Sequence, residues 1–145
     1  MGLDMYLTIG KGRNREEVGY WRKANAIHNF FVNTIQNGVD DQEAYKIGKK
    51  TFQLLLKKCE TLLDKAKEEG YDPDYTGCNY EFKPSKELER ACQTVLPSCS
   101  GFFFGGTDYD VWYFNSLEYT RKLIDGILED WEPGQKKNYY YSCWW

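Results

Sequence analysis

Residues 3–9 alternate between hydrophobic and polar side chains. One face of an extended segment would carry the apolar members Leu3, Met5, Leu7 and Ile9. This period of two predicts a half-buried strand over 3–9. Residues 139–145 alternate in the same way and are rich in β-prone tyrosine and tryptophan, which predicts a strand at that end of the chain. We expect these two strands to pair.

A period of 3.6 residues indicates helices in the intervening chain. The clearest helix is predicted at 50–69, where apolar residues recur at spacings of three and four. Another is expected at 22–36. A third should lie between Ser85, a predicted N-cap, and Pro97. The last is expected at 115–131.

Turn and capping residues set the expected ends of these elements. Asn37 and Gly38 should end the first helix, because both tolerate a left-handed backbone. Asn115 and Glu118 have the spacing of a capping box and would start the last helix. The phenylalanines between glycines at 101–106 predict a short buried strand. Residues 107–114 would form a loop or another short strand.

The whole pattern predicts a compact single α+β domain spanning 1–145. About four helices would pack on a small sheet formed by N-terminal, central and C-terminal strands. A chain of 145 residues is long enough for one hydrophobic core.

Charge and hydropathy narrow the class of protein. With 22 acidic and 19 basic residues the net charge is −3. Such a balance argues against extended nucleic-acid binding, which needs clustered cations. No run approaches the ~18 apolar residues of a membrane span, and the first residues lack the basic start of a secretory signal. We therefore expect a cytoplasmic protein with no membrane partner.

The cysteines do not have the spacing of a metal site or a disulfide framework. There are five of them, at Cys59, Cys78, Cys92, Cys99 and Cys143. Their odd number and the lack of a secretory signal favour reduced thiols, with Cys59 and Cys92 on apolar helix faces. Because His28 is the single histidine, we predict no metal site and no cofactor. A nucleophilic Cys–His pair stays open, although nothing marks a cysteine as activated.

The densest group of polar and aromatic residues lies at 20–29. The side chains that could bind a ligand there are Tyr20, Trp21, Arg22, Lys23, Asn25, His28 and Asn29. A helix start offers backbone N–H groups to anions, and the two cations would add attraction for phosphate. Tyr20 or Trp21 would stack on a flat ring. The asparagines and the histidine would read its polar edges.

The alternative for the same segment is structural. Trp21 would fill the core, and Arg22 would pair with an acid such as Asp108 or Asp110. The histidine and asparagines would then be ordinary helix residues. Composition alone favours this alternative.

Residues 101–113 give a second group of candidates, because glycines allow close backbone approach. The side chains assigned from it to the expected ligand site are Phe104, Asp108, Tyr109 and Tyr113. Asp108 and Asp110 form a D-x-D pair that could hold Mg²⁺, but turn or capping roles are favoured. Tyr109, Trp112 and Tyr113 could line a pocket or cover the core. Because the sequence contains no NTPase, serine-hydrolase or dinucleotide motif, no catalytic residue is assigned.

Three segments carry a resemblance to a known family. They are 1–7 (MGLDMYL), 19–31 (GYWRKANAIHNFF), and Leu96–Pro97 with 101–105 (GFFFG) and Tyr109–Asp110. Together they resemble a family of small, mostly uncharacterised proteins of tailed bacteriophages and prophages, over most of the chain. The resemblance implies a phage protein that acts in the bacterial cytoplasm. It assigns no role to any single residue.

In that context we expect an accessory protein that binds and sequesters a nucleotide-derived host immune signal. A cyclic oligonucleotide or a cyclic ADP-ribose-type molecule would be such a signal. This anti-defence sponge would not need catalysis, and we expect a homo-oligomer that encloses the ligand. The alternatives are an inhibitor that binds a host protein, a small enzyme acting on a nucleotide, and a phage structural protein.

Overall fold

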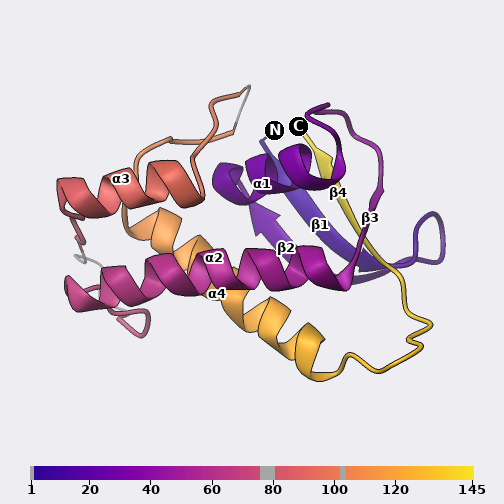
Figure 1. Cartoon of the computed structure of the whole chain (residues 1–145). Helices are drawn as coiled ribbons and strands as arrows, with labels where there is room; N and C mark the ends of the chain where they lie inside the picture. Colours follow the sequence, from indigo (N-terminus) through magenta and orange to yellow (C-terminus); the bar gives the residue numbers. More distant parts are fainter. Residues whose placement is uncertain (1, 76–80, 102–103) are drawn as a thin grey trace.

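The computed structural model describes residues 2–75, 81–101 and 104–145. In this part of the chain the elements run β1 (Asp4–Ile9), β2 (Glu16–Arg22), α1 (Asn25–Ile35), β3 (Tyr45–Ile47), α2 (Lys49–Glu68), α3 (Lys86–Val95), α4 (Val111–Glu129) and β4 (Tyr139–Trp144). The helices pack beside a four-stranded antiparallel sheet (Figure 1). The predicted α+β class, with four helices on a small sheet, is therefore confirmed.

The sheet has the strand order β2-β1-β4-β3, and each strand is antiparallel to its neighbours. On the central strand β1, Met5 lies opposite Trp21 of β2 and Cys143 of β4. The predicted pairing of the first and last strands is confirmed. It brings the two ends of the chain close together (Figure 1).

The two faces of the sheet have different surroundings. On the inner face Met5, Trp21 and Tyr141 are buried against the helices. Side chains of the intervening positions point to the other face, where Tyr20 and Trp144 are exposed. This alternation is the one expected of an antiparallel sheet covered on one side.

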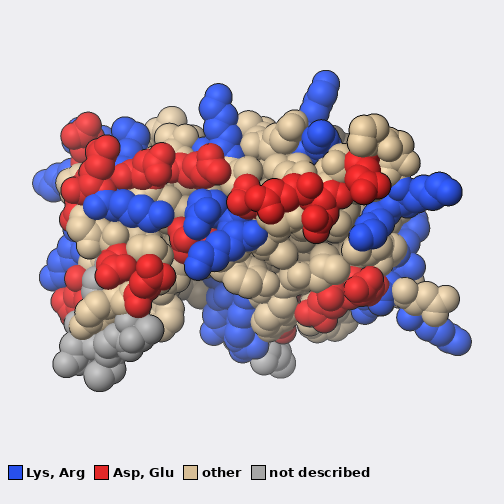
Figure 2. Space-filling view, turned by 90° about the horizontal axis from the view of Figure 1, so that it is seen from below, with Lys and Arg blue, Asp and Glu red and all other residues tan. Residues whose placement is uncertain are grey.

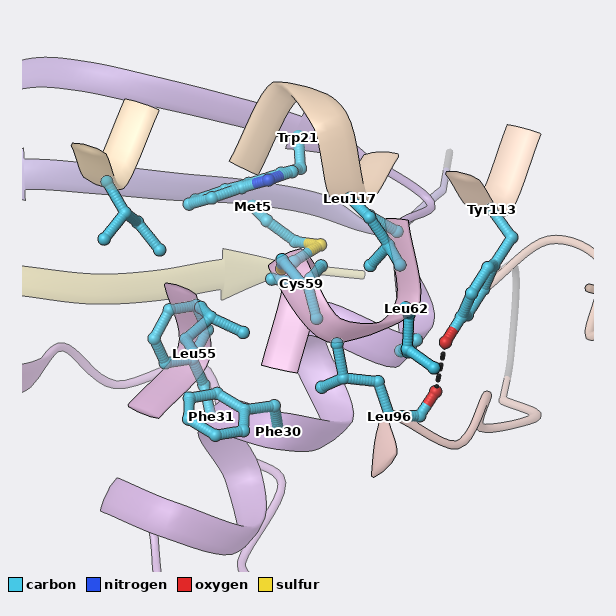
Figure 3. Close-up of a cluster of buried hydrophobic side chains, with 14 of the residues drawn as sticks. Met5, Trp21, Phe30, Phe31, Leu55, Cys59, Leu62, Leu96, Tyr113 and Leu117 are labelled. Carbon is cyan, nitrogen blue, oxygen red and sulfur yellow. Dashed lines mark hydrogen bonds between the residues drawn. The ribbon is translucent and has the colours of Figure 1, made fainter. Parts of the chain in front are cut away.

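Helices α2 and α4 pack against each other beside the sheet, and both supply several of the buried apolar side chains (Figure 1). Leu55, Cys59 and Leu62 of α2 are fully buried, as is Leu117 of α4, and they belong to the same core cluster as Met5 and Trp21 (Figure 3). Burial of each large apolar side chain stabilises the fold by roughly 1.5–3 kcal/mol. The apolar stripe predicted for 50–69 is therefore the stripe that packs.

Three predicted helix ends can be compared with the structure. Asn37 and Gly38 follow α1 with φ of 54° and 79°, the left-handed backbone predicted for them. Ser85 caps α3, since its hydroxyl accepts from the Leu88 amide at 3.1 Å. The capping box predicted to start the last helix at Asn115 is wrong. Asp110 caps α4 instead, and its carboxylate accepts from the amide of Tyr113 at 3.1 Å.

Two other predictions about the elements need correction. The first helix begins at Asn25 rather than Arg22, because β2 continues through Arg22. The described residues of the central strand expected at 101–106 are not part of the sheet; the fourth strand is instead the short edge strand β3, which was not predicted. Gly101 and residues 104–106 belong to no strand, and 102–103 lie outside the described residues.

The structure also shows where the cysteines and the charged side chains lie. Cys59 and Cys92 are buried as predicted, and like Cys99 and Cys143 they are free thiols; Cys78 lies outside the described residues. On the face shown in Figure 2, acidic and basic side chains are interspersed rather than separated into large fields. Within the described residues, no helix is both long and apolar enough to span a bilayer.

Candidate ligand-binding cleft

A cleft of about 520 Å³ opens where the end of β2 meets the start of α1. One side is formed by residues 20–27, and the other by the first turns of α4, with the 105–106 backbone and Ser98 between them. We call this space the α1/α4 cleft. Its volume falls within the range typical of small-molecule sites.

The amino end of α1 faces this cleft without a capping side chain. Ala24 occupies the N-cap position and gives no side-chain cap. The Asn25 amide donates to the Lys23 carbonyl at 2.9 Å, so the amides of Ala26 and Ile27 are the ones left without an intrahelical acceptor. The first turn also lacks an acidic residue. Because the first amides of a helix have no intrahelical acceptor, they carry a partial positive charge toward whatever lies in front of them. Residues 24–27 line the cleft, so this potential acts inside it.

Arg22 and Lys23 precede the helix and add positive charge to the cleft. Arg22 is half-exposed and reaches Asp4, with 3.3 Å between its Nη1 and the carboxylate. The partner is thus Asp4 rather than the Asp108 or Asp110 considered from the sequence. Lys23 is exposed and forms no ion pair within the residues that the structure describes.

The position of Lys23 depends on its backbone. Its φ of 57° is left-handed, which is uncommon for a residue other than glycine. Its amide donates to the Leu3 carbonyl at 2.7 Å, so the strained turn is held by the residue that precedes β1. A Cβ at Gly105 would come within 3.1 Å of the Lys23 Cβ, so the two backbone segments approach closely here. The lysine side chain is therefore held at the edge of the cleft.

Exposed aromatic rings supply flat surface along the cleft. Trp112, in the first turn of α4, is 75% exposed, whereas Tyr20 and Tyr119 are about 40% exposed, at 39% and 43%. The hydroxyl of Tyr20 donates to Asp4, and this hydrogen bond is the main reason that the pKa of the phenol is raised. Trp112 is the ring with the most surface free for a ligand.

The role expected for Trp21 is corrected by the structure. Its side chain is only 3% exposed, and its indole N–H donates to the Thr120 hydroxyl at 2.8 Å. Its ring packs edge-on against Phe31 in the core. Trp21 therefore forms the floor of the cleft, as the structural alternative held for this residue, and leaves little surface for stacking.

Asn25 is also used by the fold. Its amide nitrogen donates to the carbonyls of Phe104 and Gly106 at 3.1 and 2.8 Å, and its oxygen accepts from the Cys99 amide at 3.1 Å. These bonds fasten Cys99, Phe104 and Gly106 to α1. Asn25 shapes the cleft wall instead of reading a ligand's polar edge.

The acidic side of the cleft comes from the start of α4. Asp108 is exposed and lines the cleft, together with Asp110. Asp110 is the helix cap, so the capping role favoured for the D-x-D pair holds for this residue. The cleft thus has cations at α1 and carboxylates at α4.

The remaining predicted site residues have structural partners. Asn29 donates to the Pro97 carbonyl and accepts from Asn33. Tyr109 accepts from the amide and hydroxyl of Ser98. Phe104 is buried edge-on against the ring of His28. None of these four side chains, Asn29, Tyr109, Phe104 and His28, lines the α1/α4 cleft.

Tyr113 does line the cleft, but most of its side chain is buried. Its hydroxyl donates to the Leu96 carbonyl at 2.7 Å (Figure 3). Burial raises the pKa of this phenol. The hydroxyl is therefore a fixed neutral donor that joins α4 to the end of α3.

Tyr119 and Trp112 line the cleft but were not assigned to it from the sequence, and Asp4 contacts two of the lining residues, Arg22 and Tyr20. Asp4 lies opposite Arg22 because β1 pairs with β2, a strand pairing that was not predicted from the sequence. The helical period places Tyr119 on the same face of α4 as Trp112, but this is visible only once the helix is known to begin at Val111. Trp112 was considered as a pocket residue, and its neighbour Tyr113 was chosen.

Comparisons with protein-family models, with curated proteins and with solved structures found no match. The site is therefore interpreted from its own geometry.

Proposed function

We propose that the α1/α4 cleft binds a small anion of the nucleotide type and that the protein acts by holding this ligand rather than by transforming it. The observation that carries the proposal is the uncapped start of α1, which faces the cleft beside Arg22 and Lys23. A helix start of this kind, with cations next to it, favours phosphate or carboxylate groups.

The ligand would lie across the cleft. A phosphate would accept from the amides of Ala26 and Ile27 and from Lys23, at about 1.5–3 kcal/mol for a hydrogen bond to a charged group. A base would stack on Trp112, a contact worth about 1–3 kcal/mol in single-strand binders. Asp108 would accept from hydroxyl or amino groups, which nucleotides also carry.

The biological role follows from the resemblance to tailed-phage proteins. A cytoplasmic phage protein that binds a nucleotide-derived host immune signal would lower the free concentration of that signal. We propose this sponge function, with a homo-oligomer enclosing the ligand. Cyclic oligonucleotides and cyclic ADP-ribose-type molecules combine a phosphate with a flat ring, the two groups that the proposed binding mode requires.

Calorimetry against a panel of such nucleotides tests the proposal. The expected result is saturable binding by the natural chain and an affinity at least about tenfold weaker in Lys23→Met, which removes the charge and keeps the length. Lys46→Met is the matched control, because Lys46 is exposed on β3 and lies outside the cleft. Absence of binding to every nucleotide, or equal losses in both variants, would contradict the proposal.

A second measurement separates binding from catalysis. The bound nucleotide is incubated with excess protein, released by denaturation and compared with the starting material by mass spectrometry. Intact nucleotide is expected for a sponge. A cleaved or modified nucleotide would establish the enzyme alternative.

The exposed ring of Trp112 also supports the alternative of a host-protein partner, since tryptophan is enriched at interface hot spots. Retention of one host protein at stoichiometric yield by the natural chain but not by Trp112→Ala would favour that function.

A further inference from the structure

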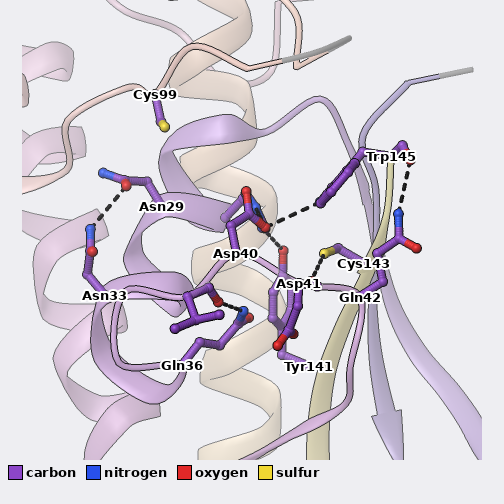
Figure 4. Close-up of polar contacts among 12 residues, drawn as sticks. Asn29, Asn33, Gln36, Asp40, Asp41, Gln42, Cys99, Tyr141, Cys143 and Trp145 are labelled. Atoms are coloured by element: carbon purple, nitrogen blue, oxygen red, sulfur yellow. Dashed lines mark hydrogen bonds and ion pairs between the residues drawn. The ribbon is translucent and has the colours of Figure 1, made fainter.

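Three potential metal ligands meet at a place that the nucleotide proposal does not use. His28 lies on α1, Asp40 lies in the connection between α1 and β3, and Cys143 lies on β4. One ligand atom from each, a ring nitrogen, a carboxylate oxygen and the sulfur, all lie within 4.8 Å of one another. Figure 4 shows Asp40 and Cys143 side by side at the end of β4.

The histidine ring is held with one nitrogen toward this group. His28 is only 1% exposed, and its Nδ1 forms a 2.6 Å hydrogen bond with the hydroxyl of Tyr141. Its Nε2 faces Asp40 at 3.0 Å. A buried imidazole with one nitrogen fixed by a neighbour is the usual arrangement of a metal-ligating histidine, because the second partner sets its orientation.

The two other ligands also have partners behind them. The indole N–H of Trp145 donates to the Asp40 carboxylate at 3.2 Å, and the Cys143 thiol donates to the carbonyl of Asp41 at 3.4 Å (Figure 4). Asp40 is about one-third exposed, whereas Cys143 is buried. The group is thus enclosed on the protein side and reachable from solvent along the carboxylate.

We propose that His28 Nε2, the Asp40 carboxylate and Cys143 Sγ form a binding site for a zinc-type divalent cation, with solvent as the fourth ligand. Imidazole nitrogen, carboxylate oxygen and thiolate are the donors that Zn²⁺ takes in proteins, at distances of about 2.0–2.3 Å. Three protein ligands and one open position match known zinc coordination.

Occupation requires small changes and the loss of a proton. The 3.0 Å hydrogen bond from the Nε2–H of His28 to Asp40 gives way to two bonds to the cation. The imidazole proton moves to Nδ1, where it is donated to the hydroxyl oxygen of Tyr141. Burial raises the pKa of the Cys143 thiol to about 12, so this sulfur is protonated in the metal-free protein at neutral pH. Binding therefore displaces the thiol proton into solvent, as thiolate ligation requires.

The consequence is a clip between parts of the chain that are far apart in sequence. One cation would join the first helix, the following connection and the last strand. This site is independent of the α1/α4 cleft, because none of its three residues lines that cleft. Failure of nucleotide binding would leave it unaffected.

Cobalt titration of the metal-free full chain tests the site. Co²⁺ bound to a thiolate gives a near-ultraviolet charge-transfer band and, in tetrahedral sites, strong visible bands, and Zn²⁺ should abolish both by displacement. We expect these bands at one equivalent of metal and a higher melting temperature with Zn²⁺ than with chelator.

The variants assign the ligands. Cys143→Ser should lose the charge-transfer band, and Asp40→Asn should keep it with an affinity reduced more than about tenfold. Cys99→Ser is the matched control and should behave as the natural chain does, because Cys99 is a partly exposed thiol outside the group.

Lack of a saturable band in the natural chain would overturn the proposal. So would a band that persists in Cys143→Ser, or one that disappears in Cys99→Ser. Should Cys143→Ser fail to fold by circular dichroism, Asp40→Asn decides the matter: unchanged affinity would then overturn the proposal.

Discussion

The α1/α4 cleft and the His28–Asp40–Cys143 group differ in how the chain assembles them. The basic side of the cleft comes from consecutive residues at the end of β2, so its chemistry is visible in the sequence. The metal-ligand group joins residues 28, 40 and 143, which meet only because β4 pairs with β1 beside α1. A local motif can thus be found without the fold, whereas a group formed by strand pairing cannot.

The two regions also differ in burial. Arg22, Lys23 and Trp112 are exposed, so changes there should affect ligand binding and leave stability nearly unchanged. His28 and Cys143 are buried, so their surroundings contribute to stability and to any metal affinity together. Comparing a variant of a buried residue with a variant of an exposed one can separate effects on stability from effects on binding.

The largest expected effect distinguishes the floor of the cleft from its exposed wall. Trp21→Ala removes a core indole and its hydrogen bond to Thr120, and should lower the free energy of unfolding by about 3–5 kcal/mol. Trp112→Ala should change it by less than about 0.5 kcal/mol, because that ring is 75% exposed. Urea denaturation of both variants measures the difference. Similar losses would mean that the ring of Trp112 is packed in solution.

The next effect concerns the buried group. Tyr141→Phe removes the hydroxyl that orients His28 and should weaken Zn²⁺ binding by about 10–100-fold, as loss of an outer-shell partner does. Tyr139→Phe, at a buried position of the same strand, is the control and should bind metal normally. Competition titration with a chelating dye gives both affinities. Equal affinities would show that the hydroxyl does not position the imidazole.

The smallest effect concerns the helix that carries Trp112. Glu118 of α4 pairs with Arg121 at 2.5 Å and with Lys67 of α2 at 3.8 Å. The hydrogen bond to Arg121 is the main reason that the pKa of Glu118 is lowered. A lowered pKa in the folded state stabilises the fold above the ordinary value of 4.5, and this contribution disappears as pH falls through the lowered value.

Glu118→Gln should therefore lower the free energy of unfolding by about 1 kcal/mol near neutral pH and by less in acid. Denaturant midpoints of the two proteins at several pH values measure this convergence. A difference between the two midpoints that stays constant down to strongly acidic pH would contradict the proposed contribution of the Glu118 charge to stability.

The sequence predicted the elements with strong internal periodicity. The stripe of 50–69 and the alternation of 3–9 and 139–145 correspond to α2, β1 and β4, because each buries one face against a single core. The start of α4 was misplaced since residues 111–114 are β-prone, and the core holds them in a helix behind the Asp110 cap. β3 has three residues, which is too few to show a period.

Ligand binding at the candidate site stays a prediction, but the positions of its residues can be compared with the structure. Arg22, Lys23 and Tyr20 do line a cleft at the start of α1. Trp21 and Asn25 belong to its structure, because alternation along β2 turns the indole inward and backbone carbonyls distant in sequence accept from the asparagine. Neither contact can be read from the local pattern.

The most direct test of nucleotide binding compares two exposed tryptophans. Trp112 lines the α1/α4 cleft and is 75% exposed, whereas Trp144 stands on the open face of the sheet and is 64% exposed. The affinity of Trp112→Ala and Trp144→Ala is measured by calorimetry with the tightest-binding nucleotide. We predict a loss of about tenfold or more in Trp112→Ala alone. A loss confined to Trp144→Ala would place the ligand on the sheet face and contradict the account.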